Sequence, residues 1–153
     1  MKRLHIHLSV ENLNQNIDFY STLFGHQPTV QHDDYAKWML DDPRVNFAIS
    51  NRSAQTGLDH LGIQAENDEE LQNIKQGLDA TQRPIKPQAE AACCYARSNK
   101  YWITDPQGIA WESFHSLKEI PTFNDQKETS DGDKSFAYRP TETEDAGSSC
   151  CSN

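Results

Sequence analysis

Residues 1–118 of this 153-residue chain repeat one pattern of apolar residues twice. Residues 4–10 alternate apolar and polar side chains, as a half-buried strand does, and residues 60–65 do so again fifty-five positions later. A helical spacing of apolar residues follows each time: Leu13, Ile17, Tyr20, Leu23 and Phe24 in the first half, and Leu71, Ile74 and Leu78 in the second. Short apolar segments then predict further strands at residues 28–31, 36–40 and 45–49, and at 85–88, 92–97, 101–104 and 109–114.

The repeat predicts two βαβββ modules, at about residues 1–52 and 57–118. Turns built on Asp42-Pro43 and Asp105-Pro106 join the last two strands of each module, because proline fixes φ and aspartate bonds forward to the backbone. One such module is too small to bury its own sheet face. We therefore expect an α+β fold in which two modules pair around a shared cleft.

Composition changes after Lys118. Residues 119–153 are rich in Asp, Glu, Ser, Thr, Lys, Pro and Gly, with only scattered apolar residues. Such a segment buries too little apolar surface to offset its conformational entropy. The sequence predicts a disordered acidic tail over these residues.

Charge and hydropathy narrow the classes of partner. The net charge is −9 and the 14 basic residues do not cluster, which argues against nucleic acid and anionic membranes as partners. The chain lacks an apolar run of about 20 residues that would span a membrane, and its first residues turn polar too soon for a signal peptide. We expect a cytoplasmic protein.

The four cysteines form two adjacent pairs, Cys93-Cys94 and Cys150-Cys151. A disulfide between neighbouring residues closes a very small, strained ring, so a reducing compartment with free thiols fits better. Two neighbouring thiolates are soft ligands for a thiophilic metal or metalloid. The alternative for Cys93 and Cys94 is a pair of small buried apolar residues.

The repeat aligns several residues that bind metals. His5 falls on His60 in the first strand of each half, and a count of seven residues from the turn aspartates aligns Ile49 with Glu112 in the last strand. Two histidines and one carboxylate with open positions are typical of non-haem Fe(II) sites that carry out oxygen chemistry. His7 competes with His5, because alternation places both on one strand face. We favour His5, since the repeat aligns His7 with Gly62.

Two motifs resemble the vicinal oxygen chelate superfamily, which includes glyoxalases, bleomycin-resistance proteins and extradiol dioxygenases. They are Asp-His-Leu-Gly at 59–62 and Asp-Pro-Gln-Gly-Ile-Ala-Trp-Glu at 105–112. Cys-Cys-Tyr-Ala at 93–96, followed by Asn-Lys-Tyr-Trp-Ile-Thr-Asp-Pro at 99–106, is similar to the signature of organoarsenical carbon–arsenic lyases, also known as cadmium-induced proteins. The resemblance covers residues 1–118 and implies the vicinal oxygen chelate fold.

The resemblance implies that Cys93 and Cys94 bind trivalent arsenic, while His5, His60 and Glu112 bind Fe(II). In relatives, the position of His5 can carry Gln. The implied activity is an O2-dependent cleavage of the carbon–arsenic bond that releases arsenite, and other divalent metals can replace Fe(II) in purified samples.

Further candidate site residues lie near the first cysteine pair and at the end of the chain. Tyr95 is a candidate to cover the arsenical and Lys100 to line the cleft, while Cys150 and Cys151 are either incidental or a capture arm. The alternatives are a dioxygenase or glyoxalase-like enzyme of the same fold, and a non-catalytic protein that binds arsenic or cadmium through thiols. The sequence leaves the organic substituent open, as well as the choice between monomer and homodimer.

Overall fold

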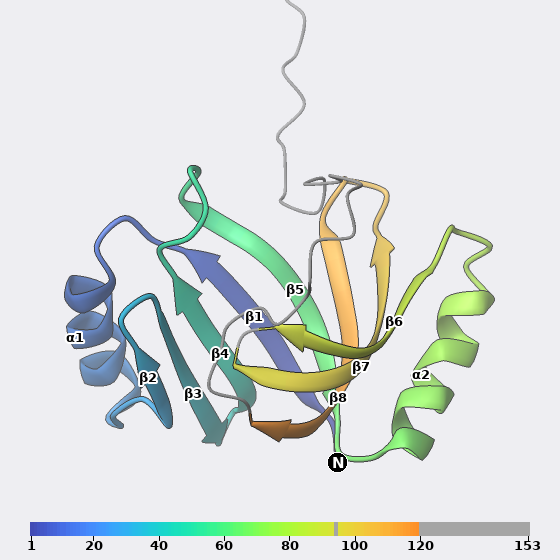
Figure 1. Ribbon diagram of the computed structural model, residues 1–153, viewed down its shortest axis with the longest axis horizontal. Helices are drawn as coiled ribbons and strands as arrows, with labels where there is room; N and C mark the ends of the chain where they lie inside the picture. The colour runs from blue at the N-terminus through green and yellow to red at the C-terminus, as the bar shows by residue number, and fades with distance from the viewer. Residues whose placement is uncertain (94, 120–153) are drawn as a thin grey trace, which may run out of the picture.

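The computed structural model describes residues 1–93 and 95–119, which form two βαβββ modules joined edge to edge (Figure 1). The first module contains β1 (Arg3–Ser9), α1 (Leu13–Phe24), β2 (Val30–His32), β3 (Tyr35–Asp41) and β4 (Arg44–Ser50). The second contains β5 (Gly57–Ala65), α2 (Asp68–Asp79), β6 (Lys86–Cys93), β7 (Ala96–Thr104) and β8 (Ala110–Glu119). The predicted α+β fold of paired modules is confirmed.

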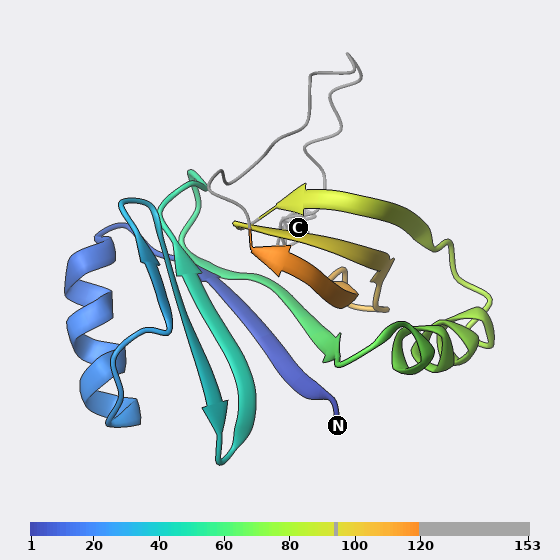
Figure 2. The same cartoon turned by 60° about the horizontal axis from the view of Figure 1, so that its bottom comes forward.

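The eight strands of the described residues belong to one sheet, in the order β2-β3-β4-β1-β5-β8-β7-β6. The two first strands, β1 and β5, pair antiparallel at its centre, so the modules join within one chain. Figures 1 and 2 show α1 at one end of the curved sheet and α2 at the other. The cleft predicted from the repeat is therefore built around β1 and β5.

The second module has three strands after its helix, whereas the sequence predicted four. Residues 92–97 do not form a separate strand: they include the end of β6 and the start of β7, with Cys93 paired to Ala96. Tyr95 has a φ of 60°, in the left-handed region. This conformation lets the chain reverse where the apolar pattern alone indicated a continuous strand.

Both helices begin at asparagine caps. The Asn12 side chain accepts a hydrogen bond from the backbone N–H of Gln15, and Asn67 does the same for Glu70. Helix α1 ends at Gly25, whose φ of 69° favours glycine. Neither helix in the described part of the chain is long and apolar enough to cross a membrane.

The core of the first module lies between α1 and the outer face of its strands. Leu13 and Ile17 of α1 pack there with Trp38, Phe47 and Ile49, and Ile6 and Leu8 of β1 pack against the same cluster. Because side chains alternate along a strand, His5 and His7 point to the opposite face, into the cleft. The core thus fixes which residues of β1 face the cleft.

Strand β8 ends at Glu119, and the domain boundary that the sequence predicts near residue 118 stays a prediction. The predicted tail and the second cysteine pair, Cys150-Cys151, lie outside the described residues.

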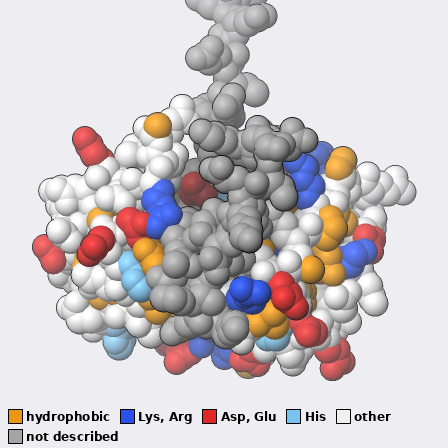
Figure 3. Space-filling view, viewed as in Figure 1, with side chains coloured by type: hydrophobic (Ala, Val, Ile, Leu, Met, Phe, Trp, Pro, Cys, Tyr) orange, Lys and Arg blue, Asp and Glu red, His pale blue; other side chains and the backbone are white. Residues whose placement is uncertain are grey.

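On the face shown in Figure 3, Lys and Arg side chains are interspersed with acidic ones.

Candidate metal centre

The register of β1 and β5 brings three histidines together. His7 pairs with His60, and His5 pairs with Gly62, which reproduces the fifty-five-residue offset of the repeat across a local two-fold axis. One ring nitrogen from each of His5, His7 and His60 lies within 4.8 Å of the others. The strand pairing thus assembles side chains that are far apart in sequence.

Glu112 joins them from β8, which runs parallel to β5 and places Glu112 beside Gly62. In the first module the corresponding register aligns Ala48, and not Ile49, with Glu112. The sequence-based alignment with Ile49 was wrong by one residue. The error arises because the two turns differ in length. Strands β3 and β4 pair up to Asp41 and Arg44, whereas five residues, 105–109, join β7 to β8. Neither alanine nor isoleucine supplies a metal ligand.

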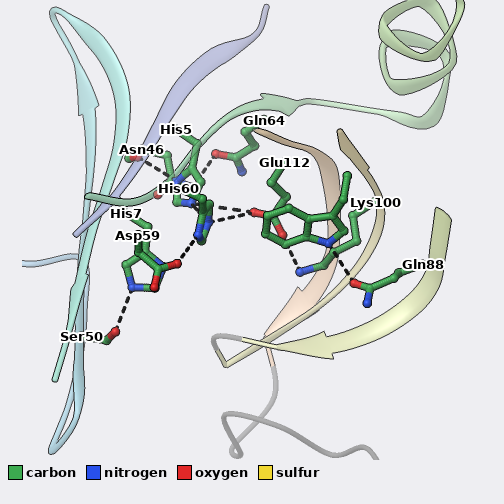
Figure 4. A network of polar contacts seen from close by, with 11 residues as sticks. His5, His7, Asn46, Ser50, Asp59, His60, Gln64, Gln88, Lys100 and Glu112 are labelled. Atoms are coloured by element: carbon green, nitrogen blue, oxygen red, sulfur yellow. Dashed lines mark hydrogen bonds and ion pairs between the residues drawn. The ribbon is translucent and has the colours of Figure 1, made fainter. Parts of the chain in front are cut away.

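His5, His60 and Glu112 converge on one point (Figure 4). The two Nε2 atoms are 3.2 Å apart, and Glu112 Oε2 lies 3.5 Å from His60 Nε2 and 3.8 Å from His5 Nε2. Two donors about 2.1 Å from one divalent ion, at right or tetrahedral angles, are about 3.0–3.4 Å apart. The observed spacing fits such an ion after small shifts, and all three side chains are buried.

The other nitrogen of each ring determines where the lone pairs point. His5 Nδ1 donates to the backbone carbonyl of Asn46 at 3.0 Å, and His60 Nδ1 donates to Asp59 Oδ1 at 2.6 Å. With the protons on Nδ1, the two neutral rings direct bare Nε2 lone pairs at each other, an arrangement that requires a proton or a metal ion between them. Hydrogen bonds of this kind orient histidines that bind metals. The chemistry of the donor set therefore fits a divalent metal.

The charges at the site also favour a cation. Burial, followed by the charge of His60, lowers the pKa of His5 to about 4. Burial works to lower the pKa of His60 as well, but its hydrogen bonds to Asp59 and Glu112 outweigh burial and raise this pKa to about 9. Burial works to raise the pKa of Glu112, but the charge of Lys100 and the contact with His60 hold it well below its ordinary value. The negative charges that raise the pKa of His60 would also attract a metal ion.

Lys100 of β7, a residue that the sequence analysis placed in the cleft, contacts the same carboxylate. Its buried Nζ donates to Glu112 Oε1 at 2.6 Å, which leaves Oε2 directed at the histidines. A small cavity of about 40 Å³ adjoins the site and is lined by residues of both modules, among them Tyr35 and Lys100. It has room for about one water molecule. A larger cavity of about 620 Å³, between α1 and β3, contains none of the predicted site residues.

The position of Asp59 depends on a β-bulge that the sequence pattern did not indicate. His60 pairs with His7, but the next pair joins Leu58 to Leu8, so Asp59 has no partner on β1. Such an extra residue re-aims its side chain. Asp59 consequently contacts His60, its neighbour in sequence, and also accepts a hydrogen bond from Ser9 Oγ at 3.2 Å.

Tyr95 lies at the turn between β6 and β7 and contacts the first module. Its ring stacks on His32 with centroids 3.5 Å apart, and its hydroxyl donates to Asp34 Oδ1 at 2.6 Å. Tyr95 is therefore docked against the first module. Cys94 and the side chain of Cys93 lie outside the described residues, so the predicted role of this cysteine pair stays a prediction.

Comparisons with known proteins agree with the fold and the motifs. Residues 2–113 match the model of the Glyoxalase/Bleomycin resistance protein/Dioxygenase superfamily. The chain is 39% identical over 125 residues to the "Trivalent organoarsenical cleaving enzyme" of Bacillus sp. (strain MD1). The aligned residues cover 78% of this chain and 76% of that protein. It is 29% identical over 140 residues to the "Cadmium-induced protein CadI" of Mycobacterium bovis, which covers 89% of this chain and 92% of that protein.

Among solved structures, the Mn(II)-bound glyoxalase from Novosphingobium aromaticivorans has a similar fold. The TM-score is 0.55 at 13% identity, over 83% of this chain and 44% of that one. This likeness concerns the fold alone, whereas the family model spans most of the chain. The chain therefore belongs to the Glyoxalase/Bleomycin resistance protein/Dioxygenase superfamily.

Proposed function

We propose that this protein is a non-haem, Fe(II)- and O2-dependent enzyme that cleaves the carbon–arsenic bond of trivalent organoarsenicals and releases arsenite. The observation that carries the proposal is the convergence of His5, His60 and Glu112 on one point, in a chain whose sequence also contains the vicinal cysteines Cys93 and Cys94. The name of the Bacillus relative, an organoarsenical cleaving enzyme, supports the choice of substrate.

In this proposal His5 Nε2, His60 Nε2 and Glu112 Oε2 hold the metal ion. When bound, Fe(II) supplies the capacity to bind and activate O2. Asp59 and the Asn46 carbonyl keep the two rings in the orientation that binding requires. Other divalent ions suit the same donors, so we expect purified samples to contain a mixture of metals.

Cys93 and Cys94 bind the substrate through arsenic. Thiolates are soft donors and As(III) is a soft, thiophilic centre, so the pair selects it over harder ions. The contacts of Tyr95 with His32 and Asp34 hold the turn against the first module. Binding through arsenic then directs the organic group toward the metal centre, and this proximity is the main catalytic contribution of the thiols.

The reaction balances with one molecule of O2 and no further reductant. For methylarsenite, CH3As(OH)2 and O2 contain the same atoms as As(OH)3 and formaldehyde. The carbon–arsenic bond breaks, one oxygen atom ends on arsenic and the other on carbon, and the methyl carbon supplies the four electrons that O2 accepts. We expect the enzyme to act in the cytoplasm, where the thiols stay reduced.

The two ligand sets predict separable defects. We expect His60→Ala to lose metal and turnover while it keeps its affinity for methylarsenite. Conversely, Cys93→Ser and Cys94→Ser should keep the metal and lose both arsenical binding and turnover, because a serine hydroxyl is nearly isosteric but hard. The pair of changes Cys150→Ser and Cys151→Ser should at most weaken turnover.

The experiment measures metal content, methylarsenite affinity and arsenite release for each variant under air. Turnover by both Cys93→Ser and Cys94→Ser would contradict the proposal that these cysteines bind an organoarsenical substrate, and it would favour a different dioxygenase or a glyoxalase-like enzyme. Tight binding without arsenite release by the iron-loaded wild type would instead indicate a protein that sequesters arsenicals.

A further inference from the structure

His7 is a buried histidine with one nitrogen that lacks a partner. Its side chain faces the cleft and the residue is 4% exposed. Nε2 lies 3.0 Å from Ser50 Oγ, but Nδ1 is buried and makes no hydrogen bond within residues 1–93 and 95–119. Buried polar atoms in folded proteins almost always have a partner, and an ion is one explanation for an exception.

The neighbours of His7 are the two histidines of the proposed metal centre. Its ring centroid is 4.9 Å from that of His60 and 6.3 Å from that of His5. One ring nitrogen from each of the three lies within 4.8 Å of the others. Two nitrogens that bind one ion at about 2.1 Å are at most about 4.2 Å apart. The 4.8 Å limit is slightly larger than this separation, so the rings have to shift for all three to bind one ion.

The hydrogen bond with Ser50 matches this role. When Nε2–H donates to Ser50 Oγ, Nδ1 carries the lone pair. In His5 and His60 the two nitrogens have the opposite roles: Nδ1 donates to an oxygen atom, and Nε2 is left for a cation. Each of the three histidines thus offers one nitrogen to the site.

The local two-fold axis allows this additional ligand in the first module only. The counterpart of His7 is Gly62, where a Cβ atom would lie 2.3 Å from the backbone oxygen of Glu112. A side chain at position 62 has no space, because β8 approaches closely there. The asymmetry places a third histidine, in the first module only, beside the two histidines that lie near Glu112.

We propose that His7 is a further ligand of the metal centre, so that the protein donors are three histidines and Glu112. The inference rests on the metal site of the proposed function. A six-coordinate ion then keeps two exchangeable positions instead of three. It also follows that the site retains part of its metal affinity when His5 is removed.

The test uses Co(II) titration for affinity and pulsed EPR of the Cu(II)-loaded protein to count bound imidazoles, on the full chain. We expect three bound imidazoles in the wild type and two in His7→Leu. The Co(II) affinity of His7→Leu should be lower than that of the wild type by at least about tenfold, because loss of a residue that only hydrogen-bonds to a metal ligand already costs about 10–100-fold. His5→Leu should retain Co(II) binding, and the His5→Leu, His7→Leu double variant should bind far more weakly. His26→Leu, at an exposed position, is the control and should match the wild type.

Ser50→Ala keeps the imidazole and removes its hydrogen bond, so it gives a second reading if His7→Leu is poorly folded. We expect a lower Co(II) affinity, by about tenfold or more. Two imidazoles in the wild type and unchanged affinity in His7→Leu and Ser50→Ala would overturn the inference while leaving the metal site intact. A wild type that binds no metal would overturn the proposed function as well.

Discussion

Replacing Lys100 with methionine tests whether the buried charges are balanced as the structure indicates. The Lys100 and Glu112 side chains are only 4% and 7% exposed, and Nζ lies 2.6 Å from Oε1. Removal of one member of such a pair leaves an uncompensated buried charge, which costs about 3–5 kcal/mol. His60, whose pKa is raised to about 9, lies beside the same carboxylate and compensates part of the loss, so we expect a cost of about 3 kcal/mol for the metal-free protein.

Urea unfolding in the presence of EDTA at neutral pH measures this cost. Lys75→Met is the matched control, because Lys75 Nζ lies 2.6 Å from Asp79 Oδ2 but the two side chains are 35% and 51% exposed, and pairs this accessible to water contribute about 1 kcal/mol or less. Adding Glu112→Gln to Lys100→Met should recover most of the lost stability, since the unpaired charge is removed. The reasoning is refuted if Lys100→Met costs no more than Lys75→Met, or if the second change brings no recovery.

Three further changes probe the surroundings of the site. Asp59→Asn keeps an acceptor for His60 but removes its charge, and should lower metal affinity by about 10–100-fold in a Co(II) titration; an unchanged affinity would argue against orientation by this carboxylate. Gly62→Ala should destabilise the protein by about 1–3 kcal/mol in urea and weaken metal binding, because the new Cβ meets the backbone of Glu112. The control Gly77→Ala, where a Cβ lies in open space on α2, should neither destabilise the protein nor weaken metal binding. A chain that ends after residue 119 should bind metal like the full chain, because all proposed donors precede that point; loss of binding would assign the rest of the chain a structural role.

The sequence was sufficient to predict the two modules. The apolar pattern of residues 4–10 recurs at 60–65, and a βαβββ unit cannot bury its sheet alone, so the pairing of the modules follows from packing. The same offset correctly matched His5 with His60, because a repeat carries equivalent residues to equivalent places in a two-fold structure.

Other features depend on local geometry that periodicity does not encode. The different turn lengths displaced the match to Glu112 from Ala48 to Ile49, and the reversal at Tyr95 divided a segment that had been predicted as one strand. The ion pair of Lys100 arises from contacts between neighbouring strands, which spacing along one strand does not reveal. The unpartnered Nδ1 of His7 likewise requires coordinates.

The most direct test of the account is the release of arsenite by the iron-loaded wild type. Methylarsenite is incubated with the protein and Fe(II) under air or under nitrogen, and arsenite and formaldehyde are quantified by chromatography. We predict equal amounts of the two products under air and none under nitrogen or from Glu112→Ala. Arsenite release that is unaffected by the absence of O2, or by the loss of Glu112, would contradict a metal- and O2-dependent cleavage of the carbon–arsenic bond.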